Sequence, residues 1–138
     1  MLSKMGLLTL CFLLTAVAAY AQVTKFKTSG GSVKFYNKTA QSWKPWEALE
    51  NASDILITLD PDADRIKIFS SSEQVFDIIK FYDVVEDSDG DEVIPFQCVD
   101  QDGRKCKLRF MILHSQNKRK QLYVDYSDMM VMYNIYNL

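Results

Sequence analysis

The stretch Val93–Ile112, VIPFQCVDQDGRKCKLRFMI, predicts a β-hairpin, and the rest of the fold is worked out from it. Two apolar-rich runs flank the tetrapeptide DQDG at residues 100–103. A three-residue hairpin loop that ends at Gly103 would place this glycine where the backbone needs a positive φ. This register sets Cys98 directly opposite Cys106.

The alternation of side chains along the two strands supports the same register. Successive side chains of a strand point to opposite sides, so Ile94, Phe96 and Cys98 share one face. In the register that the turn sets, Phe96 lies opposite Leu108 and Ile94 lies opposite Phe110. Both strands therefore turn apolar residues to the same side, which predicts one wall of a core.

Cys98 and Cys106 predict a disulfide bond. They are the two cysteines that remain if an export signal is removed, and exported proteins commonly oxidise such pairs. A bridge across a nine-residue loop would stabilise the fold by about 2–3 kcal/mol. A redox pair would have C-x-x-C spacing, and a zinc site would need more ligands than two cysteines and one histidine supply. We therefore expect a structural bridge.

Residues 1–21 are predicted to be a secretory signal peptide. Lys4 gives a positive start, residues 7–17 form an apolar run, and Ala-Tyr-Ala at 19–21 gives a small-x-small cleavage pattern. The run is shorter than the about 20 residues that a membrane-spanning helix needs. We expect a secreted or periplasmic protein with one domain at 22–138 and no integral membrane segment after cleavage; an uncleaved anchor is the alternative.

The composition indicates a globular domain and excludes several classes of protein. Hydrophobic residues make up 48% of the chain and charged residues 25%, which argues against a disordered or low-complexity chain. Sixteen Lys and Arg residues against eighteen Asp and Glu give a formal net charge of −2. This balance lacks the basic excess that nucleic-acid binding requires, so we expect no nucleic-acid partner.

A second hairpin is predicted at residues 55–69. Its loop at 61–64 pairs Leu59 with Ile66 and Ile57 with Ile68, so the apolar sets match again. Alternating or β-branched runs predict further strands at 33–36, 121–126 and 129–136.

The segment Val75–Val85 fits a strand and also a helix. Its apolar residues lie at strand spacing and at helical spacing, and Ser70-x-x-Glu73 resembles a capping box. Its β-branched and aromatic content favours a strand. With it, the sequence predicts an all-β fold: an antiparallel meander of seven or eight strands that forms a small barrel or a sandwich, with one disulfide.

These features together resemble a group of exported proteins. A leader that ends in Ala-x-Ala before Gln22, Trp43-x-x-Trp46, apolar hairpins and Phe96-x-Cys98-x-Asp100-x-x-Gly103-x-x-Cys106 are similar to small exported proteins of unknown function common in Bacteroidetes. Some of those proteins have lipocalin-like meander barrels. The resemblance implies an envelope location and a β fold, and it implies no catalytic residues. We also expect no cofactor.

The candidates for catalysis and metal binding are few. His114 is the only histidine, and no nucleophile elbow accompanies it, so we expect no catalytic residues. The acidic segments 86–92 and 60–64 offer the oxygen ligands that calcium prefers, but neither fits an EF-hand. Solvated turns rich in polar residues are the favoured interpretation of both, and we expect no metal.

Two sets of residues are candidates for facing a ligand or partner. Lys105, Lys107 and Arg109 point away from the core face as a basic stripe. This stripe fits either a charge-compensated surface or a site for an anionic glycan, lipid head group or protein. Trp43 and Trp46 offer flat faces for a sugar or lipid, although core packing is the commoner use of tryptophan.

The sequence therefore favours a non-enzymatic binding or interaction module of the cell envelope with an unknown small ligand, glycan or protein partner. The alternative is a proteinaceous inhibitor of an extracellular protease that presents one exposed turn. A hydrolase comes third and would require His114 in a cleft beside a serine or carboxylate. A barrel interior filled by side chains would leave surface recognition in place of a deep ligand cavity.

Overall fold

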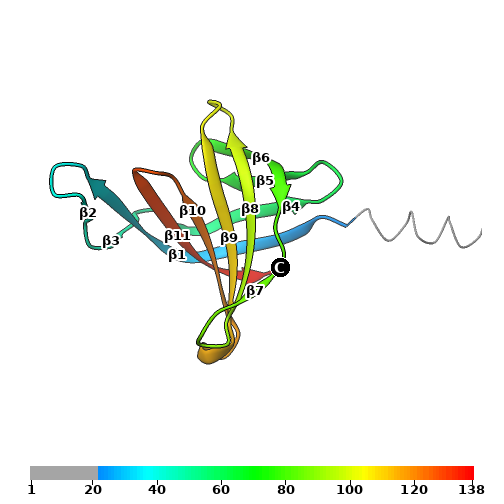
Figure 1. Cartoon of the computed structure of the whole chain (residues 1–138). Coiled ribbons are helices and arrows are strands. Elements are labelled where there is room, and N and C mark those ends of the chain that lie inside the picture. Colours follow the sequence, from blue (N-terminus) through cyan, green and yellow to red (C-terminus); the bar gives the residue numbers. More distant parts are fainter. Residues whose placement is uncertain (1–21) are drawn as a thin grey trace, which may run out of the picture.

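A computed structural model describes residues 22–138, and the predicted signal peptide at 1–21 lies outside the described residues. The described chain is built from β-strands and one 3₁₀ turn (Figure 1). The elements, in chain order, are β1 Thr24–Asn37, β2 Ser42–Trp43, β3 Glu47–Ala48, β4 Ser53–Asp60, β5 Arg65–Phe69, β6 Glu73–Phe81, β7 Val85–Glu86, β8 Glu92–Asp100, β9 Lys105–Leu113, η1 His114–Gln116, β10 Arg119–Asp125 and β11 Met129–Asn137.

Eight of the strands close into an antiparallel barrel. Their order is β11-β10-β9-β8-β6-β5-β4-β1, and β1 pairs with β11 to close the ring. Neighbours in the barrel follow one another along the chain, so the predicted meander is confirmed and the barrel replaces the sandwich. The short strands β2 and β3 pair with β1, and β7 pairs with β8.

The two predicted hairpins have the predicted registers. Leu59 pairs with Ile66 between β4 and β5, and Phe96 pairs with Leu108 between β8 and β9. Gly103 has a φ of +79°, as the turn requires. Local turn chemistry and side-chain alternation were therefore sufficient to define both pairings.

Residues 75–85 form a strand and then leave regular structure. They continue β6 to Phe81 and reach β7 at Val85, which confirms the strand and excludes the helix. Beyond Asp77, β6 no longer pairs with β5 and has β8 as its strand neighbour. Five large apolar side chains of this run are 40–57% exposed: Ile79, Phe81, Tyr82, Val84 and Val85.

The middle of the barrel is filled by side chains. Ile57, Ile66, Ile68, Leu108 and Leu122 have no exposed surface. Each lies on the inward face of its strand, so the alternation read from the sequence becomes a continuous core. This packing leaves hollows at the barrel ends in place of a cavity through its centre.

A polar clamp holds β1 against β4. Thr28 is 1% exposed; its hydroxyl donates to the carbonyl of Ala52 and accepts from the amide of Ile55 at 3.0 Å. The register of β1 and β4 shifts at this point, between Lys27 and Ser29. The Thr28 side chain therefore supplies hydrogen bonds where the regular ladder is interrupted.

The predicted disulfide is wrong, although the register behind it is right. Cys98 and Cys106 pair across β8 and β9 and are buried, but both are free thiols. The amide of Asp100 donates to the carbonyl of Arg104, so these two residues form a hydrogen-bonded pair of the antiparallel ladder. Hydrogen-bonded and non-hydrogen-bonded pairs alternate along such a ladder, so Cys98 and Cys106, two positions further on, are also a hydrogen-bonded pair. Such pairs keep their Cβ atoms about 5.5 Å apart, wider than the about 3.5–4.5 Å that a disulfide spans.

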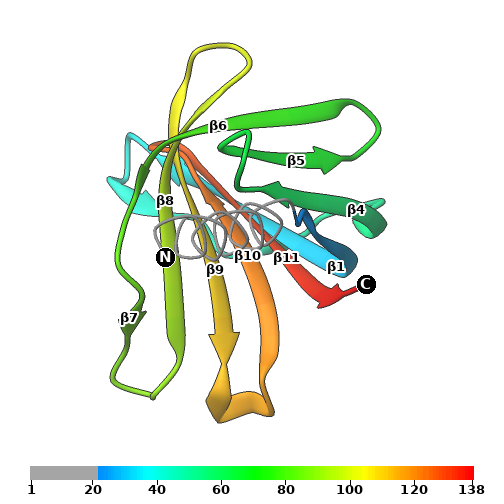
Figure 2. The same cartoon turned by 90° about the vertical axis from the view of Figure 1, so that its right-hand side faces the viewer.

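The barrel has two chemically different ends. In Figure 2 the strands β8, β9 and β10 extend below β4 and β5, and the connection between β9 and β10, which contains the η1 turn, lies at the bottom of the view. The opposite end holds the β5–β6, β8–β9 and β10–β11 turns. Within residues 22–138, no helix has the length and apolar character needed to cross a membrane.

Candidate functional site

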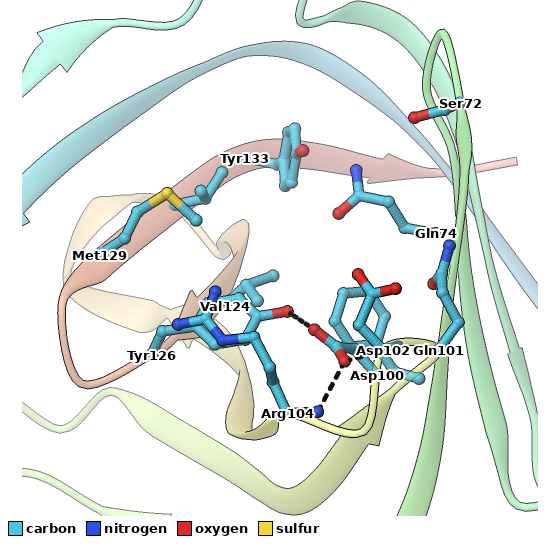
Figure 3. Close-up of a pocket in the computed structure, with 12 residues that line it drawn as sticks. Ser72, Gln74, Asp100, Gln101, Asp102, Arg104, Val124, Tyr126, Met129 and Tyr133 are labelled. Atoms are coloured by element: carbon cyan, nitrogen blue, oxygen red, sulfur yellow. Dashed lines mark hydrogen bonds between the residues drawn. The ribbon is translucent and has the colours of Figure 1, made fainter.

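The turn-bearing end of the barrel holds a hollow of about 270 Å³, which we call the polar mouth (Figure 3). Its floor is formed by inward-facing apolar side chains, and its walls come from the three turns at this end. The lining residues are Ser72, Gln74, Phe76, Asp100, Gln101, Asp102, Arg104, Val124, Tyr126, Met129, Val131 and Tyr133. A second hollow of about 300 Å³ adjoins it through Gln74 and Tyr133.

Hydrogen bonds between the turns fix the walls of the polar mouth. The hydroxyl of Tyr126 donates to the Asp100 carboxylate at 2.7 Å, and Arg104 pairs with Asp128 at 3.0 Å (Figure 3 shows the Tyr126–Asp100 bond). The Arg104 guanidinium also lies 4.4 Å from the centre of the Tyr126 ring. These contacts join the β8–β9 turn to the β10–β11 turn, so the mouth is organised before any ligand arrives.

The side chain of Gln101 joins the third turn to the other two. Its carbonyl oxygen accepts from the amide of Val75 at 2.7 Å, and its amide donates to the carbonyl of Glu73 at 2.8 Å. The Gln101 side chain thereby gives hydrogen-bond partners to two backbone groups at the start of β6, directly after the turn at 70–72.

The pKa shifts in the mouth follow from these contacts. Burial raises the pKa of Tyr126, and the hydrogen bond to Asp100 raises it further. Burial acts to raise the pKa of Asp100 as well, but hydrogen bonds from Tyr126 and from the amides of Arg104 and Asp102 outweigh it, and the pKa is lowered. The wall of the mouth therefore carries an ionised carboxylate at neutral pH beside a neutral phenol.

The opposite end of the barrel holds a smaller hollow of about 140 Å³, which we call the apolar pocket. A row of phenylalanine rings crosses it: Phe26 lies 5.4 Å from Phe110, and Phe110 lies 6.0 Å from Phe96. Phe81 continues the row, 5.4 Å from Phe96. The lining residues are Phe26, Leu59, Ile94, Phe96, Phe110, Met111, Ile112, Lys120, Ile135 and Asn137.

The tryptophans singled out from the sequence lie outside the barrel. Trp43 and Trp46 belong to the arm, residues 38–52, which stands to one side of the barrel in Figure 1. They are 37% and 41% exposed, so neither fills the core. The ammonium of Lys34 lies 5.2 Å from one ring and 4.7 Å from the other. A cation of the chain itself therefore already lies over one face of each indole ring.

The structure brings one tryptophan next to one member of the basic stripe. The ring of Trp46 lies 6.2 Å from that of Tyr123, and the guanidinium of Arg109 lies 4.4 Å from the same tyrosine ring. Arg109 also forms an ion pair with Asp125. Its charge is thus compensated within the protein, which favours the charge-compensated interpretation at this position.

The other two members of the basic stripe, Lys105 and Lys107, are exposed and form no ion pair within residues 22–138. Lys105 and Lys107 are exposed while Cys106 and Leu108 between and beside them are buried, so the predicted outward orientation is confirmed. The ammonium of Lys107 lies 5.9 Å from the ring of Tyr82. Neither lysine borders the polar mouth or the apolar pocket.

The residues considered for hydrolysis do not form a nucleophile–base pair. His114 bonds Glu92 at 2.9 Å, and its side chain is 38% exposed. The neighbouring hydroxyl of Ser115 donates to the carboxylate of Asp91 instead. The histidine therefore has a carboxylate partner but no serine, and it lies on the surface rather than in a cleft.

The acidic loop before β8 brings three carboxylates together. One oxygen from each of Asp87, Asp89 and Asp91 lies within 4.8 Å of the others. Two of the three carboxylates already have protein partners: Asp87 accepts from the amides of Asp89 and Asp91, and Asp91 accepts from Ser115. The Asp60 carboxylate likewise accepts from the amides of Asp62 and Ala63. Both loops have the geometry of self-capped turns.

The residues of the polar mouth were not recognised in the sequence. Gln74 lies at the start of β6, and Arg104 and Tyr126 lie in two separate turns; the closed barrel gathers all three at one end. Only the Asp100–Arg104 turn carried a local signal, because its hairpin register was readable. Comparison with protein-family models, with curated proteins and with solved structures finds no match to this chain.

Proposed function

We propose that the protein is an exported, non-enzymatic binding module of the cell envelope that holds a small neutral polar ligand, such as one sugar unit of a glycan, in the polar mouth. The observation that carries the proposal is the convergence of hydroxyl, amide and tyrosine groups from three turns around one hollow (Figure 3). A concave site with a few convergent polar groups is the usual form of a small-ligand site.

The size of the mouth supports a ligand of about one sugar unit. Its volume of about 270 Å³ lies near the lower end of ligand pockets, about 300 Å³. The packed core below excludes a longer ligand from the barrel interior, because Phe76 at the floor is 1% exposed. The adjoining hollow at Gln74 and Tyr133 gives room for a second unit of a chain.

The charges around the mouth disfavour an anionic ligand. Asp100, Asp102 and the nearby Asp128 carry three negative charges against the single positive charge of Arg104. An anionic ligand would meet this excess at short range. Sugar hydroxyls both donate and accept, so they suit the carboxylates, the Gln74 amide and the hydroxyl of Ser72.

A titration with simple sugars tests the proposal. Galactose, mannose and N-acetylglucosamine are added to isotope-labelled protein at millimolar concentration, and backbone amide shifts are followed by NMR. We expect shifts at residues 72–74, 100–104 and 126–133 for at least one sugar. If none of the three shifts these amides, or if shifts concentrate at Trp43 and Trp46, the mouth is not a sugar site.

A matched pair of variants sharpens the test. Gln74→Ala removes an amide that lines the mouth and should weaken sugar binding about tenfold, the effect of one good hydrogen bond. Gln97→Ala removes an amide on β8 that does not line it and should leave affinity unchanged. Equal affinities in the two variants would contradict the proposal.

The protease-inhibitor alternative has one supporting feature, the arm that stands out from the barrel (Figure 1) and carries the exposed residues Lys44-Pro45-Trp46. Inhibition of serine or cysteine proteases at nanomolar protein, lost on replacing Lys44, would favour it over ligand binding. The same assay without inhibition leaves the binding module as the proposal.

A further inference from the structure

The apolar pocket contains a lysine on the inward face of the barrel wall. Lys120 of β10 is in register with Ile112 on one side and with Ile135 on the other, and Ile135 is 6% exposed. Paired residues of neighbouring strands point to the same side, so the Lys120 stem follows the core face. Lys120 is half-buried and lines the apolar pocket, and its ammonium lies at the exposed edge of that pocket.

The charge of Lys120 has no acidic partner. Its ammonium donates to the side-chain oxygen of Asn137, which is neutral. The ion pairs found within residues 22–138 involve Arg65, Lys67, Arg104, Arg109 and His114 and do not include Lys120. A partly desolvated cation gains most from a partner of opposite charge, so this position favours an anionic group.

The surroundings add positive charge on the same side. A hollow of about 340 Å³ shares Lys120, Ile135 and Asn137 with the apolar pocket and adds Lys118 and Arg119 to its walls. The apolar pocket therefore opens towards a basic rim. Apolar surface inside and cationic groups at the opening are complementary to an amphiphile with an anionic head.

We propose that the apolar pocket is a second binding site, which takes an anionic amphiphile with an unbranched chain of about six carbon atoms. The chain lies against Phe26, Phe96 and Phe110, and the anionic head meets the Lys120 ammonium. The length follows from the volume of about 140 Å³, because an apolar cavity of about 150 Å³ holds benzene. This site is separate from the polar mouth and goes beyond the proposed function.

Head-group chemistry tests the proposal on the unaltered protein. Hexanoate, hexan-1-ol and hexylamine share one chain and differ in charge. NMR titration should show hexanoate binding about tenfold more tightly than hexan-1-ol and hexylamine binding most weakly. Amide shifts should centre on residues 94–96, 110–112 and 120. Equal affinity for the acid and the alcohol, or shifts at the mouth residues 100–104, would overturn the assignment.

Chain length tests the apolar half of the site. Hexanoate has two methylene groups more than butyrate, and each buried methylene contributes about fourfold in affinity. Hexanoate should therefore bind about fifteenfold more tightly than butyrate. No gain between the two acids would show that the chain does not enter the pocket.

A charge-matched pair of variants tests the role of the lysine. Lys120→Gln should reduce hexanoate affinity about tenfold and remove the preference over hexan-1-ol. Lys105→Gln removes the same charge from an exposed position on β9 and should change neither. An equal loss in both variants would assign the effect to net charge. The head-group series decides the proposal even if Lys120→Gln does not fold.

Discussion

The two ends of the barrel are formed by the same eight strands, but one end is lined mainly by polar groups and the other mainly by apolar side chains. At the polar mouth, hydroxyl, amide and carboxylate groups from three turns are tied to one another, as in the Tyr126–Asp100 bond. At the apolar pocket, phenylalanine rings lie beside a lysine that has no acidic partner. The core between them is packed, so a substitution that lines one end should leave the structure of the other end unaltered. The comparison shows how one small barrel presents two separate hollows, one for each of the two proposed sites.

The largest expected effect comes from opening the layer between the two ends. Phe76→Ala should lower the free energy of unfolding by about 3–5 kcal/mol, because the ring is fully buried at the floor of the mouth and leaves a cavity. Urea unfolding measures the change. Ile79→Ala, at a position 56% exposed, is the control and should cost under about 1 kcal/mol. Similar losses would mean that the middle of the barrel is not a packed layer.

A smaller loss is expected at the end that carries the η1 turn. Asp91→Ala removes a buried carboxylate that accepts from the amide and the hydroxyl of Ser115, and it should cost about 2 kcal/mol. Asp89→Ala removes an exposed carboxylate from the same loop and should have an effect within about 0.5 kcal/mol. If the two variants are equally stable, Asp91 does not join this loop to the η1 turn.

The polar mouth should respond to pH through Asp100. Tyr126→Phe removes a hydrogen bond to the Asp100 carboxylate and should lower the free energy of unfolding by about 1–2 kcal/mol at pH 7. The folded-state pKa of Asp100 is lowered, so its contribution is present above the unfolded pKa of about 3.9 and is lost as pH falls through the folded pKa. The stability difference between the two proteins should therefore narrow below about pH 4. A difference that is constant from pH 7 to pH 3 would contradict this linkage.

No effect is expected from reduction of the protein. Cys98 and Cys106 are free, and burial raises the pKa of Cys98 to about 12 and that of Cys106 to about 11, so few thiolates are available for oxidation. Unfolding midpoints with and without dithiothreitol should coincide. A disulfide would instead give a loss of about 2–3 kcal/mol on reduction.

The local part of the fold was readable in the sequence, and the long-range part was not. Turn residues and alternation defined the pairing of Leu59 with Ile66 and of Phe96 with Leu108. The pairing of β1 with β11 joins the two ends of the described chain, and no local sequence pattern predicts this pairing. The expected early strand covered residues 33–36, whereas β1 begins at Thr24, because the two glycines at 30–31 are accommodated beside a register shift rather than ending the strand.

The candidate sites show the same division. Alternation predicted correctly that Lys105 and Lys107 face outwards, but it could not show that Trp46 would come close to Arg109 through Tyr123. The disulfide was mispredicted because register gives the opposition of two residues and not the separation of their Cβ atoms. The polar mouth depends on three turns that meet only when the barrel closes. No single stretch of sequence predicts that meeting.

The Thr28 clamp has a consequence for how this chain can vary. Because one buried hydroxyl holds both Ala52 and Ile55, the hydrogen bonding of β1 to β4 is re-established immediately after the arm. Residues 38–41 form the exposed turn that precedes the pairings of β2 and β3 with β1, so length changes within this turn would not propagate into the barrel. This turn is thus a segment where insertions, deletions or a grafted epitope can be accepted while the scaffold keeps its shape.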